Sequence, residues 1–190
     1  DQNRDCPAKK YCDYLLYIKT PNNESLKVYK AIKKITLEFG ISGVLVAGVE
    51  LAILGSFLAR KFKTKSIGLL AAKNATNKIN RAKIFRKNYI PYANFEILKD
   101  INFCNKKYPF VLKTEEGSGS RGVRVISSEK DHIFVKKEFS ALRNTKFLIE
   151  EFIQGEEISI EAFIYKSKFN YYCFAIRDIE LIANGNLIEH

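Results

Sequence analysis

Short apolar blocks alternate with helix-like segments along the first 70 positions of the chain. Residues 14–18, 43–47 and 66–70 are apolar runs with the length of buried strands. Between them, residues 26–39 and 50–62 place apolar side chains at helical spacing. The order strand, helix, strand, helix, strand predicts a parallel, doubly wound sheet.

The pattern changes after about residue 72. Residues 73–87 form a polar segment with helical spacing, and Pro91 then prevents a helix from continuing. Short strand-like runs follow at hairpin spacing, interrupted by one helix-like segment at about 130–143. The strands are expected within YPFVLKT, GVRVI, KFLIEEF, EISIEAFIY and NYYCFAIRD. We therefore expect two domains, residues 1–72 and 73–190.

One apolar stretch, residues 41–59, approaches the length that a membrane-spanning helix requires. Glu50 lies near its centre, and a carboxylate at that depth of a bilayer is costly. A buried strand that turns at Gly48 into an apolar helix explains the stretch better, so no membrane span is expected.

The overall charge is strongly positive, because 32 Lys and Arg outnumber 21 Asp and Glu to give a net charge of +11. Such a charge suits polyanionic partners, but the lysines form no long run, which favours a solvated basic surface. The four cysteines include no C-x-x-C pair, and there are two histidines, so a zinc site is not expected. A reducing cytoplasm accounts for these cysteines most simply.

A glycine-rich loop, EEGSGSRGVRVI at residues 115–126, joins two strand-like segments. It lacks the G-x-x-x-x-G-K-[ST] pattern of a P-loop, and a strand follows it where a dinucleotide-binding motif would have a helix. Lys113 ends the apolar strand before the loop. Backbone N–H groups of such a loop can cradle phosphates, although a plain hairpin turn is the alternative reading.

Three ordered segments resemble the ATP-grasp superfamily, in the branch of biotin carboxylase and the large chain of carbamoyl-phosphate synthase. They are NKINRAKIFRKNYIPYANF, YPFVLKTEEGSGSRGVRVI and FLIEEFIQGEEISIEAFI. The chain departs from the branch's usual motifs at Asn77, where Asp is usual, and at Tyr92 and Thr114, which stand where prolines are usual. The resemblance implies an α/β chain: a Rossmann-like pre-ATP-grasp domain followed by an α+β ATP-grasp domain, incomplete at both ends.

The resemblance also implies a set of site residues. Lys78 and Lys113 would contact the ATP phosphates, and Glu157 would hold the ribose hydroxyls. The adenine would lie at the hinge, with its amino group bound by Glu150 or Glu151 and its ring edge read by the backbone of Phe152 and Ile153. A lid over the phosphates would be formed by Gly117, Ser118, Gly119, Ser120 and Gly122.

The implied function is that of an ATP-dependent ligase that joins a carboxylate to an amine through an acyl phosphate. ATP and Mg²⁺ are the expected cofactors, and the metal ligands are expected beyond His190, while the catalytic residues stay unassigned. Small-molecule carboxylate and amine substrates are the expected partners, nucleic acid is not, and a homodimer is left open. The alternatives are a basic nucleic-acid-binding module and an ATP-binding protein without ligase activity.

Overall fold

The computed structural model describes residues 3–18, 24–37, 40–46, 51–101, 107–117, 122–142 and 144–189. The chain divides into two compact units, Asp1–Asn77 and Lys78–His190, which are described separately below. The division lies a few residues beyond the domain boundary that composition suggests at residue 72.

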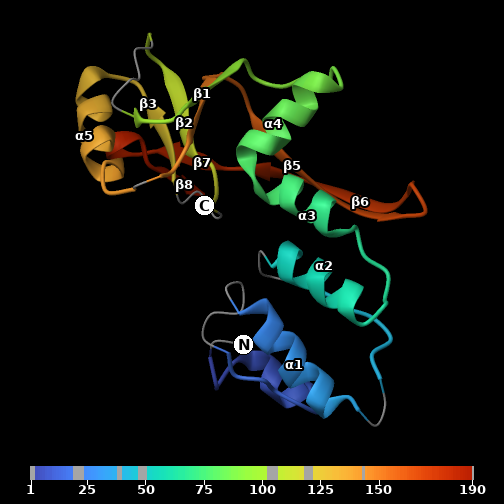
Figure 1. Cartoon of the computed structure of the whole chain (residues 1–190). Coiled ribbons are helices and arrows are strands. Elements are labelled where there is room, and N and C mark those ends of the chain that lie inside the picture. Colours follow the sequence, from blue (N-terminus) through green and yellow to red (C-terminus); the bar gives the residue numbers. More distant parts are fainter. Residues whose placement is uncertain are drawn as a thin grey trace. The chain divides into compact units, whose positions relative to one another are not determined.

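The first unit is helical where it is described (Figure 1). A short 3-10 helix, η1 (Pro7–Tyr11), precedes α1 (Ser25–Ile35), α2 (Ala52–Lys61) and α3 (Leu69–Thr76). The α1 and α2 helices confirm the two helices predicted from apolar spacing. They share a small core of buried residues that comprises Val28, Leu54 and Leu58.

The three strands predicted for this unit do not form. Residues 14–18 and 43–46 are irregular, and residues 69 and 70 belong to α3, while residue 47 lies outside the described residues. Leu45 is 89% exposed, so this apolar run is not a buried strand. A strand is stabilised by hydrogen bonds to a neighbouring strand, and no strand is present in the described residues between 3 and 77. The predicted Rossmann-like arrangement is therefore not confirmed.

The second unit contains a four-stranded antiparallel sheet with the order β1-β4-β2-β3. Its strands are β1 (Phe95–Leu98), β2 (Phe110–Thr114), β3 (Val123–Ile126) and β4 (Phe147–Glu151). The predictions for β2, β3 and β4 are confirmed. The short β1 was missed, because its four residues FEIL carry little alternation.

Two helices cover opposite faces of this sheet (Figure 1). On one face, α5 (Glu129–Phe139) buries Val135 and Phe139 against side chains such as Leu112 and Ile149. On the other, α4 (Lys78–Lys87) buries Ile79 and Ala82 against Phe95 and Leu148. Because neighbouring strand residues point to opposite faces, Leu112 faces α5 while Lys113 faces the other side.

The remaining strands lie outside that sheet. The long strands β5 (Glu157–Tyr165) and β6 (Lys168–Arg177) form a two-stranded antiparallel ribbon, and both confirm the sequence prediction. Two short strands, β7 (Ile179–Leu181) and β8 (Leu187–Glu189), pair around the 3-10 turn η3 (Ala183–Gly185). None of the helices in the described part of the chain is long and apolar enough to cross a membrane.

Candidate functional site

The second unit holds a cavity of about 1060 Å³ that gathers residues from distant parts of the sequence. The lining includes five of the residues that the sequence singled out: Lys78, Lys113, Phe152, Ile153 and Glu157. Its other residues include three valines on the sheet, Val111, Val123 and Val125, which form an apolar floor. The volume is at the upper end of the range common for small-molecule sites.

Lys78 connects the start of α4 to the glycine loop. Its backbone N–H donates to the carbonyl of Glu115 at 3.0 Å, and its Nζ donates to the carbonyl of Gly117 at 2.7 Å. The residue is buried, so its charge lies at the cavity rather than in bulk water. The Lys78 ammonium therefore places a positive charge directly beside the carbonyl of Gly117 in the loop.

Lys113 forms an ion pair with Glu150, and the hydroxyl of Tyr92 donates a hydrogen bond to the same carboxylate. In the β2–β4 register Val111 lies opposite Glu150, so Lys113 reaches Glu150 diagonally across the two strands. Glu150 is only 4% exposed, and its two partners offset the cost of burying a carboxylate. Burial and the neighbouring carboxylate raise the pKa of Tyr92, so its hydroxyl remains a donor.

Glu151 takes part in a different set of contacts. Its carboxylate accepts hydrogen bonds from the backbone N–H of Asn94 at 3.0 Å and from Asn94 Nδ2 at 2.8 Å. These bonds lower the pKa of Glu151. Glu150 and Glu151 both line a second cavity of about 510 Å³, and neither lines the larger one. The two neighbouring glutamates, which the sequence treated as alternatives, therefore differ in their partners: Glu150 binds Lys113 and Tyr92, and Glu151 binds Asn94.

Glu157 begins the β5–β6 ribbon and forms an ion pair with Arg177 at 2.5 Å. Both residues line the 1060 Å³ cavity, as does Asp178. The sequence analysis missed Arg177, because its position opposite Glu157 depends on the ribbon register. The valine floor had a detectable signal, since alternation along β2 and β3 already places these side chains on one face.

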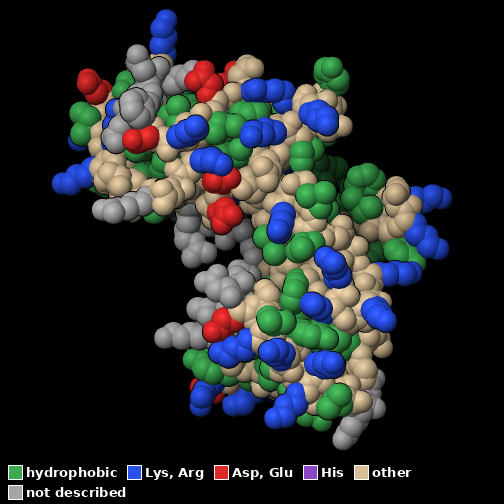
Figure 2. Space-filling view, in the orientation of Figure 1, with side chains coloured by type: hydrophobic (Ala, Val, Ile, Leu, Met, Phe, Trp, Pro, Cys, Tyr) green, Lys and Arg blue, Asp and Glu red, His purple; other side chains and the backbone are tan. Residues whose placement is uncertain are grey.

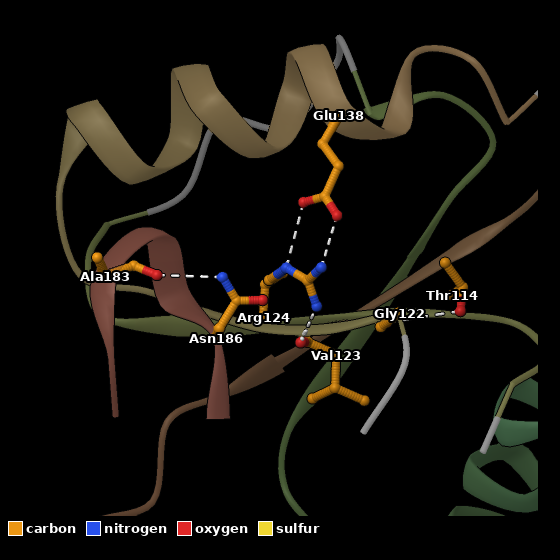
Figure 3. Close-up of polar contacts among 7 residues, drawn as sticks. All are labelled: Thr114, Gly122, Val123, Arg124, Glu138, Ala183 and Asn186. Atoms are coloured by element: carbon orange, nitrogen blue, oxygen red, sulfur yellow. Dashed lines mark hydrogen bonds and ion pairs between the residues drawn. The ribbon is translucent and has the colours of Figure 1, made fainter. Parts of the chain in front are cut away.

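Gly122, at the far end of the glycine loop, lies beside Thr114 at the end of β2 (Figure 3). Gly117 and Gly122 have φ angles of 126° and 75°, in the left-handed region that favours glycine. The N–H of Thr114 donates to the carbonyl of Gly122 at 2.8 Å. A proline at position 114 would lack this donor. Ser118, Gly119 and Ser120, which were predicted to form the lid, lie outside the described residues.

An ion pair between Arg124 and Glu138 connects β3, the strand after the loop, to α5 (Figure 3). Arg124 donates through Nη2 and Nε to the two oxygens of Glu138, at 2.5 and 3.2 Å. Its Nη1 also donates to the carbonyl of Val123 at 2.8 Å. This bidentate pairing fixes the start of β3 against the helix.

A model of a known protein family, described as the ATP-grasp domain, matches residues 106–169. The chain is 30% identical over 102 residues to carbamoyl-phosphate synthase of Methanobrevibacter smithii. This match covers 52% of this chain and 26% of that protein. It is 28% identical over 120 residues to D-alanine–D-alanine ligase of Rickettsia typhi, covering 62% of this chain and 35% of that protein. The chain thus matches about a third or less of these relatives' lengths.

The fold comparison agrees with the sequence comparison. The L-amino acid ligase from Bacillus licheniformis superposes with a TM-score of 0.69 over 83% of this chain and 38% of that one, at 18% identity. At this identity the likeness concerns the fold alone. The predicted resemblance to the ATP-grasp superfamily is therefore confirmed, with residues 106–169 matching the ATP-grasp domain model and the fold agreeing with it.

Proposed function

We propose that this chain is the nucleotide-binding part of an ATP-dependent ligase that joins a carboxylate to an amine. The single observation that carries the proposal is the 1060 Å³ cavity, where Lys78 and Lys113 face the same space as Phe152, Ile153 and Glu157. Two cations, an apolar floor and an acceptor carboxylate match the three chemical parts of ATP. The family match over residues 106–169 supports the same nucleotide.

In this proposal the phosphates bind at Lys78, Lys113 and the glycine loop. A lysine is a compact charge that meets a phosphate oxygen from a flexible stem. The adenine lies at Phe152 and Ile153, and the ribose hydroxyls donate to Glu157, whose carboxylate can accept two O–H groups at once. Glu150 acts on the nucleotide through its ion pair with Lys113, whose position it sets.

The proposed reaction transfers the γ-phosphate of ATP to a substrate carboxylate, and an amine then displaces phosphate from the acyl phosphate. The residues of this chain bind and orient the nucleotide and place positive charge near the phosphates. Magnesium is proposed to accompany ATP. Within the described ranges, no group of three or more acids, cysteines or histidines fits a metal ion, so the ATP phosphates are its proposed ligands here.

The same proposal includes the finer organisation of the chain. Residues 1–72 are proposed to precede the ATP-grasp domain, and residues 73–190 to form its nucleotide-binding part. The relatives named carbamoyl-phosphate synthase and D-alanine–D-alanine ligase support small-molecule carboxylate and amine substrates. They do not select one substrate. A cytoplasmic setting is also proposed, on the cysteine usage alone.

The test is calorimetric titration of the chain with ATP and Mg²⁺. Replacing Lys113 by Ala should weaken binding roughly 10- to 100-fold, because a hydrogen bond to a charged group contributes about 1.5–3 kcal/mol. The matched control is Lys137→Ala, which removes an exposed lysine from α5 outside the cavity. The melting temperature of each variant shows whether it remains folded.

Two results would count against the proposal. Absence of ATP binding by the unmodified chain would remove the nucleotide. Equal losses for Lys113→Ala and Lys137→Ala would show that binding reflects net charge rather than this cavity. Lys113→Met serves as a second variant if Lys113→Ala fails to fold, since it keeps an unbranched side chain over the same space.

A further inference from the structure

We infer that Thr114 is a positioning residue that holds the two described ends of the glycine loop, residues 115–117 and Gly122, in place before a ligand arrives. The inference rests on the proposed function, since it concerns how the same cavity receives phosphates. Thr114 is the last residue of β2 and directly follows Lys113. It is buried, and its side chain points to the face opposite the 1060 Å³ cavity, so it is not a contact for the nucleotide.

The backbone of Thr114 closes the base of the loop. Its N–H donates to the carbonyl of Gly122 at 2.8 Å, which joins the residue before the loop to the residue after it. The register of β2 and β3 pairs Lys113 with Val123 immediately below. The backbone hydrogen bonding between β2 and β3 therefore continues one residue beyond their paired positions. It holds Thr114 and Gly122, which flank the loop, opposite each other.

The side chain of Thr114 holds the first part of the loop, residues 115–117. Its Oγ1 donates to the carbonyl of Glu116 at 2.6 Å, two residues further along, which bends the chain at that point (Figure 3 shows the threonine beside Gly122). The same hydroxyl also lies 3.5 Å from the carbonyl oxygen of Gly122, as a second and longer hydrogen bond. A Cβ added to Gly122 would lie 2.2 Å from Thr114 Oγ1 and 3.1 Å from Cγ2. Threonine at 114 and glycine at 122 are thus matched in shape.

Other hydrogen bonds hold residues 115–117 between the start of α4 and the segment before β4. Glu115 accepts from the backbone N–H of Lys78 at 3.0 Å, and its own N–H donates to the carbonyl of Lys146 at 3.0 Å. Gly117 accepts from Lys78 Nζ. Residues 114–117 are therefore hydrogen-bonded to the start of α4, to the segment before β4 and to Gly122. Thr114 is the first residue of this range.

The consequence concerns the cost of binding. A glycine-rich segment loses much conformational entropy when a ligand orders it. A base that is already held in place reduces that cost, which raises affinity without adding a contact. The effect should apply to ligands that carry phosphates and should be absent for adenosine, which does not reach the loop.

The experiment compares Thr114→Val, Thr114→Ser and the matched control Thr145→Val in the full 190-residue chain. Valine keeps the shape of threonine and removes the hydroxyl, whereas serine keeps the hydroxyl. Thr145 lies before β4 and lines the same 680 Å³ cavity as Thr114, on the side of the loop base away from the nucleotide. ATP and adenosine affinities are measured by calorimetry, and amide hydrogen exchange is measured without any nucleotide.

The expected result has two parts. In Thr114→Val, amides of residues 114–117 should exchange faster, and ATP binding should weaken roughly 3- to 10-fold while adenosine binding is unchanged. Thr114→Ser should restore both properties, and Thr145→Val should leave both as they are. A purely structural defect would change the melting temperature and both affinities together.

The exchange measurement keeps this inference separable from the proposed function. If the unmodified chain binds no ATP, the proposed function fails, and exchange at residues 114–117 still decides whether Thr114 holds the loop base. If ATP binds and Thr114→Val changes neither exchange nor the ratio of ATP to adenosine affinity, the positioning role is overturned. Loss of adenosine affinity equal to that of ATP would overturn it as well.

Discussion

Strands β4 and β5 follow one another in the sequence and are similarly apolar, but they end in opposite environments. Ile149 in β4 is 3% exposed, whereas Ile160 in β5 is 58% exposed. β4 lies between β1 and β2 in the four-stranded sheet, with α4 and α5 over its two faces. Among the described strands, β5 pairs only with β6, and Figure 2 shows hydrophobic side chains at the surface in the region of this ribbon.

The difference shows that strand formation and burial depend on different features. Both strands satisfy the local preference of β-branched and aromatic residues. Only β4 has neighbours on both edges and a helix against each face, so only β4 contributes to a core. An isolated two-stranded ribbon is marginally stable in water, so apolar residues in β5 and β6 contribute little to unfolding free energy in this chain.

The largest expected effect is a loss of stability from a substitution in β4 that the equivalent substitution in β5 should not cause. Ile149→Ala should lower the free energy of unfolding by about 2–5 kcal/mol, because it leaves a cavity in a packed core. Ile160→Ala is the matched control and should change it by less than about 0.5 kcal/mol, as is usual for a surface position. Urea unfolding measures both. A loss at Ile160 equal to that at Ile149 would mean that the ribbon is packed in solution.

A smaller effect concerns the two ion pairs of the same strands. Glu150→Gln should cost about 1–3 kcal/mol of stability, because it leaves the partly buried Lys113 without its charged partner. Glu157→Gln should cost less than about 1 kcal/mol, because the Glu157 side chain is 51% exposed and its pair with Arg177 is screened by solvent. Melting in low and high salt tests this, and equal costs for both variants would contradict it.

The smallest expected effect is a pH dependence of stability in the four-stranded sheet and α5, which the β5–β6 ribbon should not share. His132 on α5 is buried, its Nδ1 lies 3.0 Å from the Tyr108 hydroxyl, and its Nε2 has no hydrogen-bond partner among the described groups. Burial and, to a lesser degree, Lys136 lower the pKa of His132, against a weaker opposite influence of Glu129. The folded protein therefore favours the neutral imidazole.

The sign of the dependence follows from proton binding. Below about pH 6.5 the unfolded chain binds a proton at this histidine that the folded protein resists, so stability falls as pH decreases from that value. His132→Phe should remove this part of the slope. Amide exchange in α5 and β2 at pH 7.5 and 5.5 provides the local measurement, with the histidine-free ribbon as internal reference. An unchanged slope in His132→Phe would exclude this residue as the cause.

Several features of the candidate site follow from the sequence alone. Period-two alternation in FVLKT places Lys113 on the face opposite Leu112, and the glycine loop that follows joins two strands as predicted. The α5 helix overlaps the predicted region, and Ser128 caps its start, because the Ser128 Oγ accepts from the N–H of Asp131. These features depend on residues within a few positions of one another, so local preference decides them.

The tertiary structure decided everything that depends on distant partners. The apolar runs at 14–18 and 43–46 form no strands, because an apolar run records a tendency to be buried and a strand also needs a neighbour. The choice of Glu150 rather than Glu151 as the partner of Lys113 depends on the β2–β4 register. The bond from Tyr92, 58 residues away in sequence, depends instead on the pairing of β1 with β4, which places Phe95 opposite Glu150. Thr114 and Tyr92, which looked like departures from a motif, both supply hydrogen-bond donors that proline lacks, and only their surroundings show how these donors are used.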